Sequence, residues 1–266
     1  MTREKLNTDW RKVSAALYQK PVDSKIFGAV ELDVTELEKF VHDKRKEGLK
    51  ITLTHIFTLA VARALRDEVP ELNCFIRRGN VVHRKNIDAM ISVLIQDNEM
   101  SSVKIENVDT MNLEELAINL GNAIKETRSG MENNTMQMKS TIARIPWPFR
   151  TWIFKLLKAL TVKWGLSIPS IGMTANNFGS FAITNIGTLG LDLGFPALFP
   201  VSNVAMVFVM GGISKKPVVI DNKVEIRRII TLSTALDHRI VDAVHGGRLF
   251  RYLKVMIRKP EVLLEK

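Results

Sequence analysis

Apolar residues in the first half of the chain follow strand spacing in some segments and helical spacing in others. Thr35, with Glu38 three residues later, matches a capping box and predicts the start of a helix. Thr52 or Thr54 is expected to cap the next helix, whose apolar residues recur at helical spacing until Pro70 forbids its continuation. The predicted elements are a helix over 8–18, a strand over 26–34, helices from 35 and from 52, a hairpin over 73–83, a strand over 87–95 and a helix over 113–128.

The second half is dominated by runs rich in β-branched and apolar residues, which are typical of buried strands. The pair Asp221–Asn222 between two such runs predicts a tight turn. Because helices and strands mingle throughout, without an internal repeat or a flexible linker, we expect one α/β domain over 1–266. The predicted elements are strands over 178–184, 204–210, 217–220 and 223–235, and a closing helix over 239–258 that Pro260 ends.

An apparent insertion at about 131–177 has a composition of its own. Between Asn133 and Asn177 it carries six cations and no carboxylate, and it holds three of the four tryptophans. From Phe149 to Trp164, apolar and basic residues are spaced for an amphipathic helix. One interpretation is a core-packing helix whose lysines face water. The other is a surface helix that docks through about 144–164 on an anionic membrane surface or a partner protein.

Composition places the chain among folded proteins with one large core, because 46% of the residues are hydrophobic and 25% are charged. A single cysteine, Cys74, cannot form an internal disulfide, which favours a reducing compartment such as the cytoplasm. Neither a signal peptide nor an apolar run long enough to cross a bilayer is found, so any membrane attachment is expected to be peripheral. The net charge of +10 favours an anionic partner. Nucleic acid is not expected, because no recognition motif accompanies the charge.

Candidate catalytic side chains gather where the last buried strand meets the last helix. His238 lies there between Asp237 and Arg239, and Asp242 follows four residues later. A neutral imidazole can take a proton from a thiol or hydroxyl nucleophile near neutral pH. The same residues would also suit a capping and salt-bridge cluster without chemistry. A third alternative is a metal site in which His238, Asp242 and His245 share one helix face, but it would need a distorted helix, so no metal ion is expected.

Two ordered motifs resemble the catalytic domain of the dihydrolipoamide acyltransferases, the core subunits of 2-oxoacid dehydrogenase complexes. The first motif is Phe-Gly-Ser-Phe-Ala-Ile-Thr-Asn-Ile-Gly over 178–187, and the second is Asp-His-Arg-Ile-Val-Asp over 237–242. The similarity extends to 31–37, 70–73 and 259–261, and it covers nearly the whole chain except 131–177. This resemblance implies a chloramphenicol acetyltransferase-like two-layer sandwich, with a mixed β-sheet and flanking helices, in a trimer.

The resemblance also implies roles for particular residues. His238 matches the general base, and Thr184 matches a serine whose hydroxyl, contributed by the neighbouring subunit, stabilises the oxyanion. Asp242 matches an Asp or Asn that helps to hold the site. Two departures from the family are Val41, where a basic residue associated with coenzyme A (CoA) is common, and Ala243, where glycine is usual. The positions that resemble CoA contacts are Thr52, Thr184, Asn185, Gly211 and Ile213.

The function implied by this resemblance is a CoA-dependent acyltransferase that moves an acyl group between a CoA thioester and a thiol, hydroxyl or amine acceptor. No lipoyl domain is found in the sequence, so we expect no lipoate on this chain and an acyl carrier supplied from elsewhere. The expected assembly is a homotrimer, which in this family can build a 24-mer or 60-mer cage, with Leu263 and Leu264 as candidate contacts. The alternative is a non-catalytic cage-forming or scaffold protein that binds a membrane or partner through the insertion.

Overall fold

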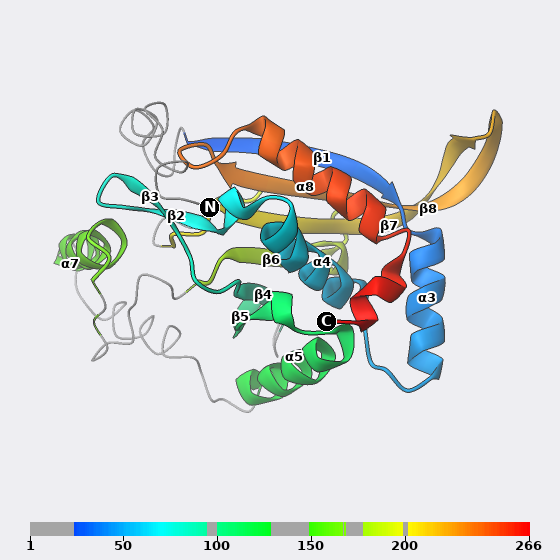
Figure 1. Ribbon diagram of the computed structural model, residues 1–266, viewed down its shortest axis with the longest axis horizontal. Coiled ribbons are helices and arrows are strands. Elements are labelled where there is room, and N and C mark those ends of the chain that lie inside the picture. The colour runs from blue at the N-terminus through cyan, green and yellow to red at the C-terminus, as the bar shows by residue number, and fades with distance from the viewer. Residues whose placement is uncertain (1–23, 95–99, 129–148, 167, 169–177, 199–201) are drawn as a thin grey trace.

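The computed structural model describes residues 24–94, 100–128, 149–166, 168, 178–198 and 202–266, and the helix predicted over 8–18 lies outside them. The main sheet is built from β1 (Lys25–Asp33), β4 (Ala89–Leu94), β5 (Met100–Ile105), β6 (Phe181–Asn185), β7 (Met206–Ile220) and β8 (Lys223–Asp237). Its strand order is β1-β8-β7-β6-β4-β5 (Figure 1). Because β6 pairs in parallel with β4 and β7 while the other pairings are antiparallel, the sheet is mixed.

Helices form a second layer against this sheet (Figure 1). The helices and short helical turns are α3 (Thr35–Lys46), α4 (Leu53–Asp67), η1 (Pro70–Asn73), η3 (Val108–Thr110), α5 (Leu113–Arg128), α7 (Phe149–Lys158), η4 (Ala159–Lys163), η6 (Gly187–Leu189), α8 (Ala243–Met256) and η7 (Pro260–Leu264). The ring of Phe208 from β7 lies 6.3 Å from that of Phe57 in α4 and 6.4 Å from that of Phe250 in α8. These contacts join both helices to the sheet in one core, which confirms the predicted α/β class.

Several predicted elements are confirmed, some of them with shifted boundaries. The helix over 113–128 and the hairpin, here β2 (Cys74–Arg77) and β3 (Asn80–His83), are present. The two strands predicted over 204–210 and 217–220 are parts of a single strand, β7, which has an irregularity between Met210 and Ile213. The closing helix begins at Ala243 instead of residue 239, because the chain first turns sharply after β8.

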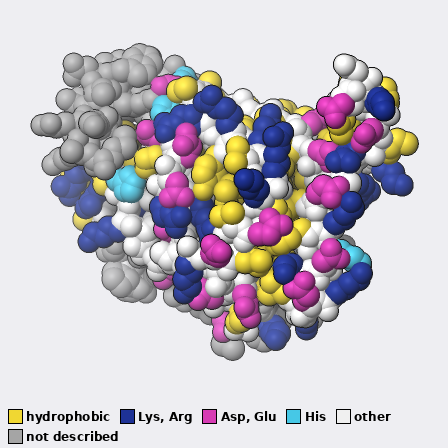
Figure 2. All heavy atoms as spheres, turned by 45° about the vertical axis from the view of Figure 1, so that its right-hand side comes forward, with side chains coloured by type: hydrophobic (Ala, Val, Ile, Leu, Met, Phe, Trp, Pro, Cys, Tyr) yellow, Lys and Arg dark blue, Asp and Glu magenta, His cyan; other side chains and the backbone are white. Residues whose placement is uncertain are grey.

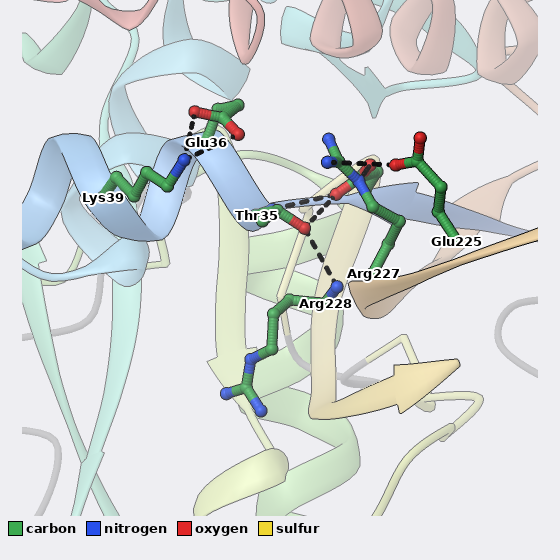
Figure 3. A network of polar contacts seen from close by, with 7 residues as sticks. Thr35, Glu36, Lys39, Glu225, Arg227 and Arg228 are labelled. Atoms are coloured by element: carbon green, nitrogen blue, oxygen red, sulfur yellow. Dashed lines mark hydrogen bonds and ion pairs between the residues drawn. The ribbon is translucent and has the colours of Figure 1, made fainter. Parts of the chain in front are cut away.

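The capping box predicted at Thr35 and Glu38 is wrong. Val34 occupies the cap position, and Thr35 is the first residue of α3. The Thr35 hydroxyl donates to the Asp33 carboxylate and accepts the backbone N–H of Arg228 (Figure 3). Glu38 pairs with the Arg228 guanidinium at 2.8 Å. Both residues therefore tie α3 to β8, a role that only the tertiary structure provides.

β7 and β8 extend beyond the rest of the sheet as a long hairpin (Figures 1 and 2). Asp221 and Asn222 have positive φ angles of 47° and 62°, which confirms the predicted tight turn at the tip. Ion pairs brace the base of the hairpin, among them Lys216 with Glu31 at 2.6 Å. Acidic and basic side chains are interspersed on the face shown in Figure 2, so the surplus positive charge is not concentrated there.

The C-terminal tail is fastened to the core by one buried guanidinium. Arg63 of α4 donates to the carbonyl oxygens of Val262, at 2.8 Å, and of Glu265. Leu263 is fully buried in the chain's own core, and Leu264 packs against it. The expectation that Leu263 contacts another trimer is therefore wrong, since its side chain is used inside its own chain.

The predicted amphipathic helix in the basic segment is confirmed as α7, which η4 extends by a π-helical turn. It lies at the opposite end of the molecule from the tip of the β7–β8 hairpin (Figure 1). Among the helices that the structure describes, none combines the length and the apolar character needed to cross a bilayer.

Candidate active site

His238 is presented by the turn that follows β8. The carboxylate of Asp237 is buried and forms a bidentate pair with the Arg239 guanidinium, with contacts of 2.9 and 2.5 Å. The Asp237 carbonyl accepts the backbone N–H groups of Ile240 and Val241. Asp237 thus holds both sides of the turn, and His238 lies between the two members of the pair with its side chain partly exposed.

The hydrogen bonds of His238 decide which ring nitrogen carries the proton. Its Nδ1 lies 2.9 Å from the carbonyl oxygen of Val241 and 3.3 Å from Oδ1 of Asp242. A carbonyl oxygen can only accept, so Nδ1 must be the donor and the neutral ring carries its lone pair on Nε2. The imidazole is therefore held in the tautomer that a general base acting through Nε2 requires.

Asp242 and His245 form the start of α8. Asp242 is the cap residue, and its backbone N–H donates to Nδ1 of His245 at 3.0 Å. The Nε2 atom of His245 faces Glu71 at 4.0 Å. The alternative of His238, Asp242 and His245 on one helix face is wrong, because the helix begins only at Ala243. No cluster of three metal-ligating side chains occurs in the part of the chain that the structure describes.

Ala243 causes no local strain. It is the first residue of α8 and does not appear among the described residues with positive φ. The backbone at position 243 therefore does not require glycine, and alanine in its place does not distort the turn in this structure.

Thr184 lies on β6, well away from His238 of the same chain. It is opposite Val209 of β7, which is opposite Ser233 of β8. His238 lies two strands across from Thr184 and five residues further along, which separates the Cα atoms by roughly 19 Å at ordinary strand spacing and rise. Neither side chain can close that gap, so the two do not meet on one substrate within a single chain.

Thr52 and Asn185 line one cavity of about 560 Å³. A face of α3 forms another wall of this cavity, and Leu53 and Thr54 at the start of α4 complete the lining. The α3 residues recur at helical spacing and include two permanent cations and a histidine: Glu38, Val41, His42, Arg45 and Lys46. Since Glu38 is paired with Arg228, the cavity has a surplus of positive charge.

Thr52 also caps α4, and His55 completes that cap. The backbone N–H of Thr52 donates to Nδ1 of His55 at 3.1 Å, and the Thr52 hydroxyl lies 2.8 Å from the same nitrogen. Burial lowers the pKa of His55 to about 4, so the ring is neutral at neutral pH and can accept these bonds. The prediction that Thr52 or Thr54 caps this helix is confirmed for Thr52.

Gly211 and Ile213 do not line this cavity. Gly211 lies at the irregularity in β7, where the chain crosses close to the Asp192 backbone. A Cβ at position 211 would overlap the Asp192 carbonyl oxygen, so close backbone approach explains the glycine. Ile213 packs against the core. Of the four predicted CoA-binding residues other than Thr184, the structure therefore groups Thr52 with Asn185 and places Gly211 and Ile213 elsewhere.

A family model described as "2-oxoacid dehydrogenases acyltransferase (catalytic domain)" matches residues 8–143 and 173–265. The chain belongs to this acyltransferase family. One curated relative is the lipoamide acyltransferase component of the branched-chain alpha-keto acid dehydrogenase complex of Bacillus subtilis (strain 168). It is 25% identical over 234 residues, which cover 86% of this chain and 45% of that protein. The chain spans about half the length of the curated relatives it matches.

Solved structures share the fold of this acyltransferase catalytic domain. A dihydrolipoamide acetyltransferase of Azotobacter vinelandii is 19% identical with a TM-score of 0.64, covering 90% of this chain and 84% of its own. The cubic core of a pyruvate dehydrogenase multienzyme complex is 20% identical with a TM-score of 0.64, at 96% and 88% coverage. A chloramphenicol acetyltransferase is 12% identical with a TM-score of 0.51, at 94% and 96% coverage. The predicted chloramphenicol acetyltransferase-like fold is confirmed.

Sequence reasoning missed the charged wall of the cavity. Val41 occupies the position where the resemblance implies a basic residue, but Arg45 lies one helical turn later on the same face, followed by Lys46. The i, i+4 spacing of Val41 and Arg45 was the available signal. The family model also leaves residues 144–172 unmatched, and α7 and η4 lie in this stretch.

Proposed function

We propose that this acyltransferase domain moves an acyl group between a CoA thioester and a thiol, hydroxyl or amine acceptor, with His238 as general base. The observation that carries the proposal is the bond from Nδ1 of His238 to the Val241 carbonyl, which leaves the basic lone pair on Nε2. The partly exposed ring lies beyond the end of a buried strand, where it is rigidly held and can still be reached by a substrate.

The proposed reaction transfers one proton to His238 and returns it. Nε2 removes the proton from the acceptor thiol, and the sulfur forms a bond to the thioester carbonyl carbon. The carbonyl oxygen becomes an oxyanion in the tetrahedral intermediate. When the intermediate collapses, the bond to the CoA sulfur breaks and the departing thiolate takes the proton from the imidazolium. Asp242, whose Oδ1 lies 3.3 Å from Nδ1, is proposed to hold the ring in place between these steps.

Thr184 is proposed to donate its hydroxyl to the oxyanion from a neighbouring subunit. The separation within one chain supports this assignment, because His238 and Thr184 can serve one thioester only if two copies supply them. The Azotobacter structure concerns the catalytic roles of a serine, a histidine and an asparagine, the asparagine four residues after the histidine. This chain has the same spacing from His238 to Asp242, and Thr184 supplies a hydroxyl.

CoA is proposed to bind with its phosphates near Arg45 and Lys46. A volume of about 560 Å³ lies within the range of small-molecule sites, and guanidinium and ammonium groups bind phosphate well. Thr52 and Asn185 add polar groups to the same cavity. Asn185 directly follows Thr184 on β6, so the cavity lies within one residue of Thr184 along the strand, although successive side chains of a strand point to opposite faces.

A homotrimer is the proposed assembly, with a cubic or dodecahedral cage as its larger form. Exposed apolar side chains on β1 and on the segment that follows β6 support association of copies: Phe27, Leu189, Leu191, Leu193 and Phe195. The rings of Phe27 and Phe195 lie edge to face at 5.4 Å, which makes part of this surface continuous. The similar cubic core of a pyruvate dehydrogenase complex supports the larger assembly.

The base assignment is tested by acyl transfer from acetyl-CoA to a panel of thiol, hydroxyl and amine acceptors. His238→Ala is expected to lower kcat by about 10²–10⁴-fold, the usual contribution of a positioned acid–base group. His83→Ala, which changes an exposed histidine on β3, is the matched control and should leave kcat unchanged. Equal rates for His238→Ala and the unmodified protein would refute His238 as the base, and no rate above the buffer background for either protein would support the non-catalytic scaffold.

The inter-subunit assignment is tested by mixing two inactive variants. His238→Ala and Thr184→Ala are unfolded together in equal amounts and refolded, so that copies combine at random. If each site takes its histidine and its hydroxyl from different copies, about a quarter of the sites regain both groups. A site contained in one chain would regain none, and activity that stays at the level of the separate variants would refute the shared site.

A further inference from the structure

The segment formed by α7 and η4 is attached to the fold by a few polar contacts. The Lys163 carbonyl accepts the backbone N–H of Arg78 at 3.2 Å, and the Val162 carbonyl accepts the side-chain amide of Asn203 at 3.2 Å. Thr161 is buried at this junction. These contacts hold η4 against the β2–β3 hairpin, and they leave much of α7 exposed. The segment lies within the stretch that the family model does not match.

α7 exposes a continuous apolar stripe. Its members follow the i, i+3, i+4, i+7 spacing of one helix face: Phe149, Trp152, Ile153 and Leu156. Trp152 is 75% exposed, which is unusual for the largest apolar side chain. Trp164 and Leu166 beyond η4 are also exposed and add to the apolar surface at this end of the molecule. A helix that served only the core would turn this face inward.

The charge of the segment and its surroundings is of one sign. Residues 133–191, which include α7 and η4, contain six cations and no carboxylate, which accounts for +6 of the net charge of +10. Lys155 and Lys163 are exposed beside the apolar stripe. Protein interfaces are depleted in lysine, whereas helices that lie on membranes combine tryptophan and other apolar side chains with lysine and arginine. Anionic phospholipid headgroups complement both properties at once.

We propose that α7 and η4 dock the domain on an anionic phospholipid surface, with the helix parallel to the membrane plane. Phe149, Trp152, Ile153 and Leu156 enter the boundary between headgroups and acyl chains, and Lys155 and Lys163 contact the phosphates. The proposal goes beyond acyl transfer and does not depend on it, because the stripe shares no residue with the candidate active site. It would place the acyltransferase reaction at a membrane surface.

The test is flotation of the full chain with vesicles of phosphatidylcholine and phosphatidylglycerol in a ratio of about two to one, at low salt. Trp152→Ser/Leu156→Ser is expected to lower the partition coefficient at least tenfold. The matched control is Val224→Ser/Ile226→Ser, which removes two apolar side chains of at least similar exposure from the β7–β8 hairpin and should change partition less than twofold. Lys155→Gln/Lys163→Gln should lower it roughly 25-fold, from about fivefold for each charge near the surface.

Four outcomes would overturn the proposal. The full chain could fail to float with the anionic vesicles, or float equally well with pure phosphatidylcholine. The hairpin control could lose as much binding as the α7 variant. Finally, light scattering on the same samples could show that Trp152→Ser/Leu156→Ser reduces the assembly mass without changing flotation, which would assign the stripe to a contact between copies. Circular dichroism of each variant establishes that it is folded, so lost binding can be read as lost contact.

Discussion

Replacing Arg239 by leucine is expected to destabilise the chain strongly, because it leaves the buried carboxylate of Asp237 without its charged partner. The side chain of Asp237 is 1% exposed and that of Arg239 is 11% exposed. Without the guanidinium, the carboxylate loses both charged contacts and keeps the backbone N–H of residue 239, at 3.2 Å, as a donor. Breaking a buried ion pair by removing one partner costs about 3–5 kcal/mol. For a domain of this size, such a loss lowers Tm by roughly 6–20 °C.

The matched control for this prediction is Arg227→Leu. Arg227 pairs with Asp33 at 2.7 Å, but the two side chains are 24% and 32% exposed. Water can solvate the Asp33 carboxylate when its partner is removed, so we expect a much smaller loss of stability than for Arg239→Leu. The double variant Asp237→Asn/Arg239→Leu buries no unpaired charge, and it should be less destabilised than Arg239→Leu alone.

Urea unfolding followed by circular dichroism measures these differences, with all variants at one protein concentration because association contributes to stability. The reasoning is refuted if Arg239→Leu and Arg227→Leu lower the free energy of unfolding equally. It is also refuted if the double variant is no more stable than Arg239→Leu. Below its unfolding temperature, Arg239→Leu should also transfer acyl groups more slowly, since the turn that orients His238 has lost its anchor.

Two further predictions concern the cap of α4 and the irregularity in β7. Burial lowers the pKa of His55 from 6.5 to about 4, so the folded chain favours the neutral ring. The free energy of unfolding should therefore be highest above pH 6.5 and fall by about 3 kcal/mol as the pH is lowered to 4. His55→Gln can still accept from Thr52 without titrating, so urea unfolding across this range should show a smaller loss, and an identical slope would contradict the argument. Gly211→Ala should lower stability by about 1–3 kcal/mol, because its Cβ meets the Asp192 backbone. Gly121→Ala in α5, where nothing lies within 4 Å, should raise it by about 0.5–1 kcal/mol, and equal shifts in Tm would refute the crowding argument.

Elements with their own periodic pattern could be predicted from sequence alone. The helix over 113–128 combines acidic residues in its first turn with an apolar stripe, and its bounds match α5. The Asp221–Asn222 turn needs two residues with positive φ, and this requirement is local to the pair. In each case the residues that decide the structure are adjacent or one turn apart, so no knowledge of the fold is needed.

Contacts between distant segments could not be predicted in this way. Thr35 looks like a helix cap because its hydroxyl is suited to one, yet that hydroxyl accepts the backbone N–H of Arg228, 193 residues away. Leu263 looks like an available apolar tail residue, yet the buried Arg63 holds its neighbours against the core. Both predictions failed because a local pattern indicates only which interactions a side chain is able to make. The packing of the helices on the sheet determines which partner lies beside it.

The candidate CoA cavity has its cations one helical turn from position 41, where the family resemblance implies a basic residue. A helix presents positions 38, 41, 42, 45 and 46 on one face, so a charge absent at Val41 can be supplied one turn later by Arg45 and Lys46. Long basic side chains can reach across such a turn, because their charged ends lie several bonds from the backbone. The attraction of a phosphate depends on where the positive charge lies in space, whichever residue of the helix carries that charge. Valine at position 41 therefore counts against CoA binding only when that position is considered alone. The cations on the whole face of α3 favour CoA binding.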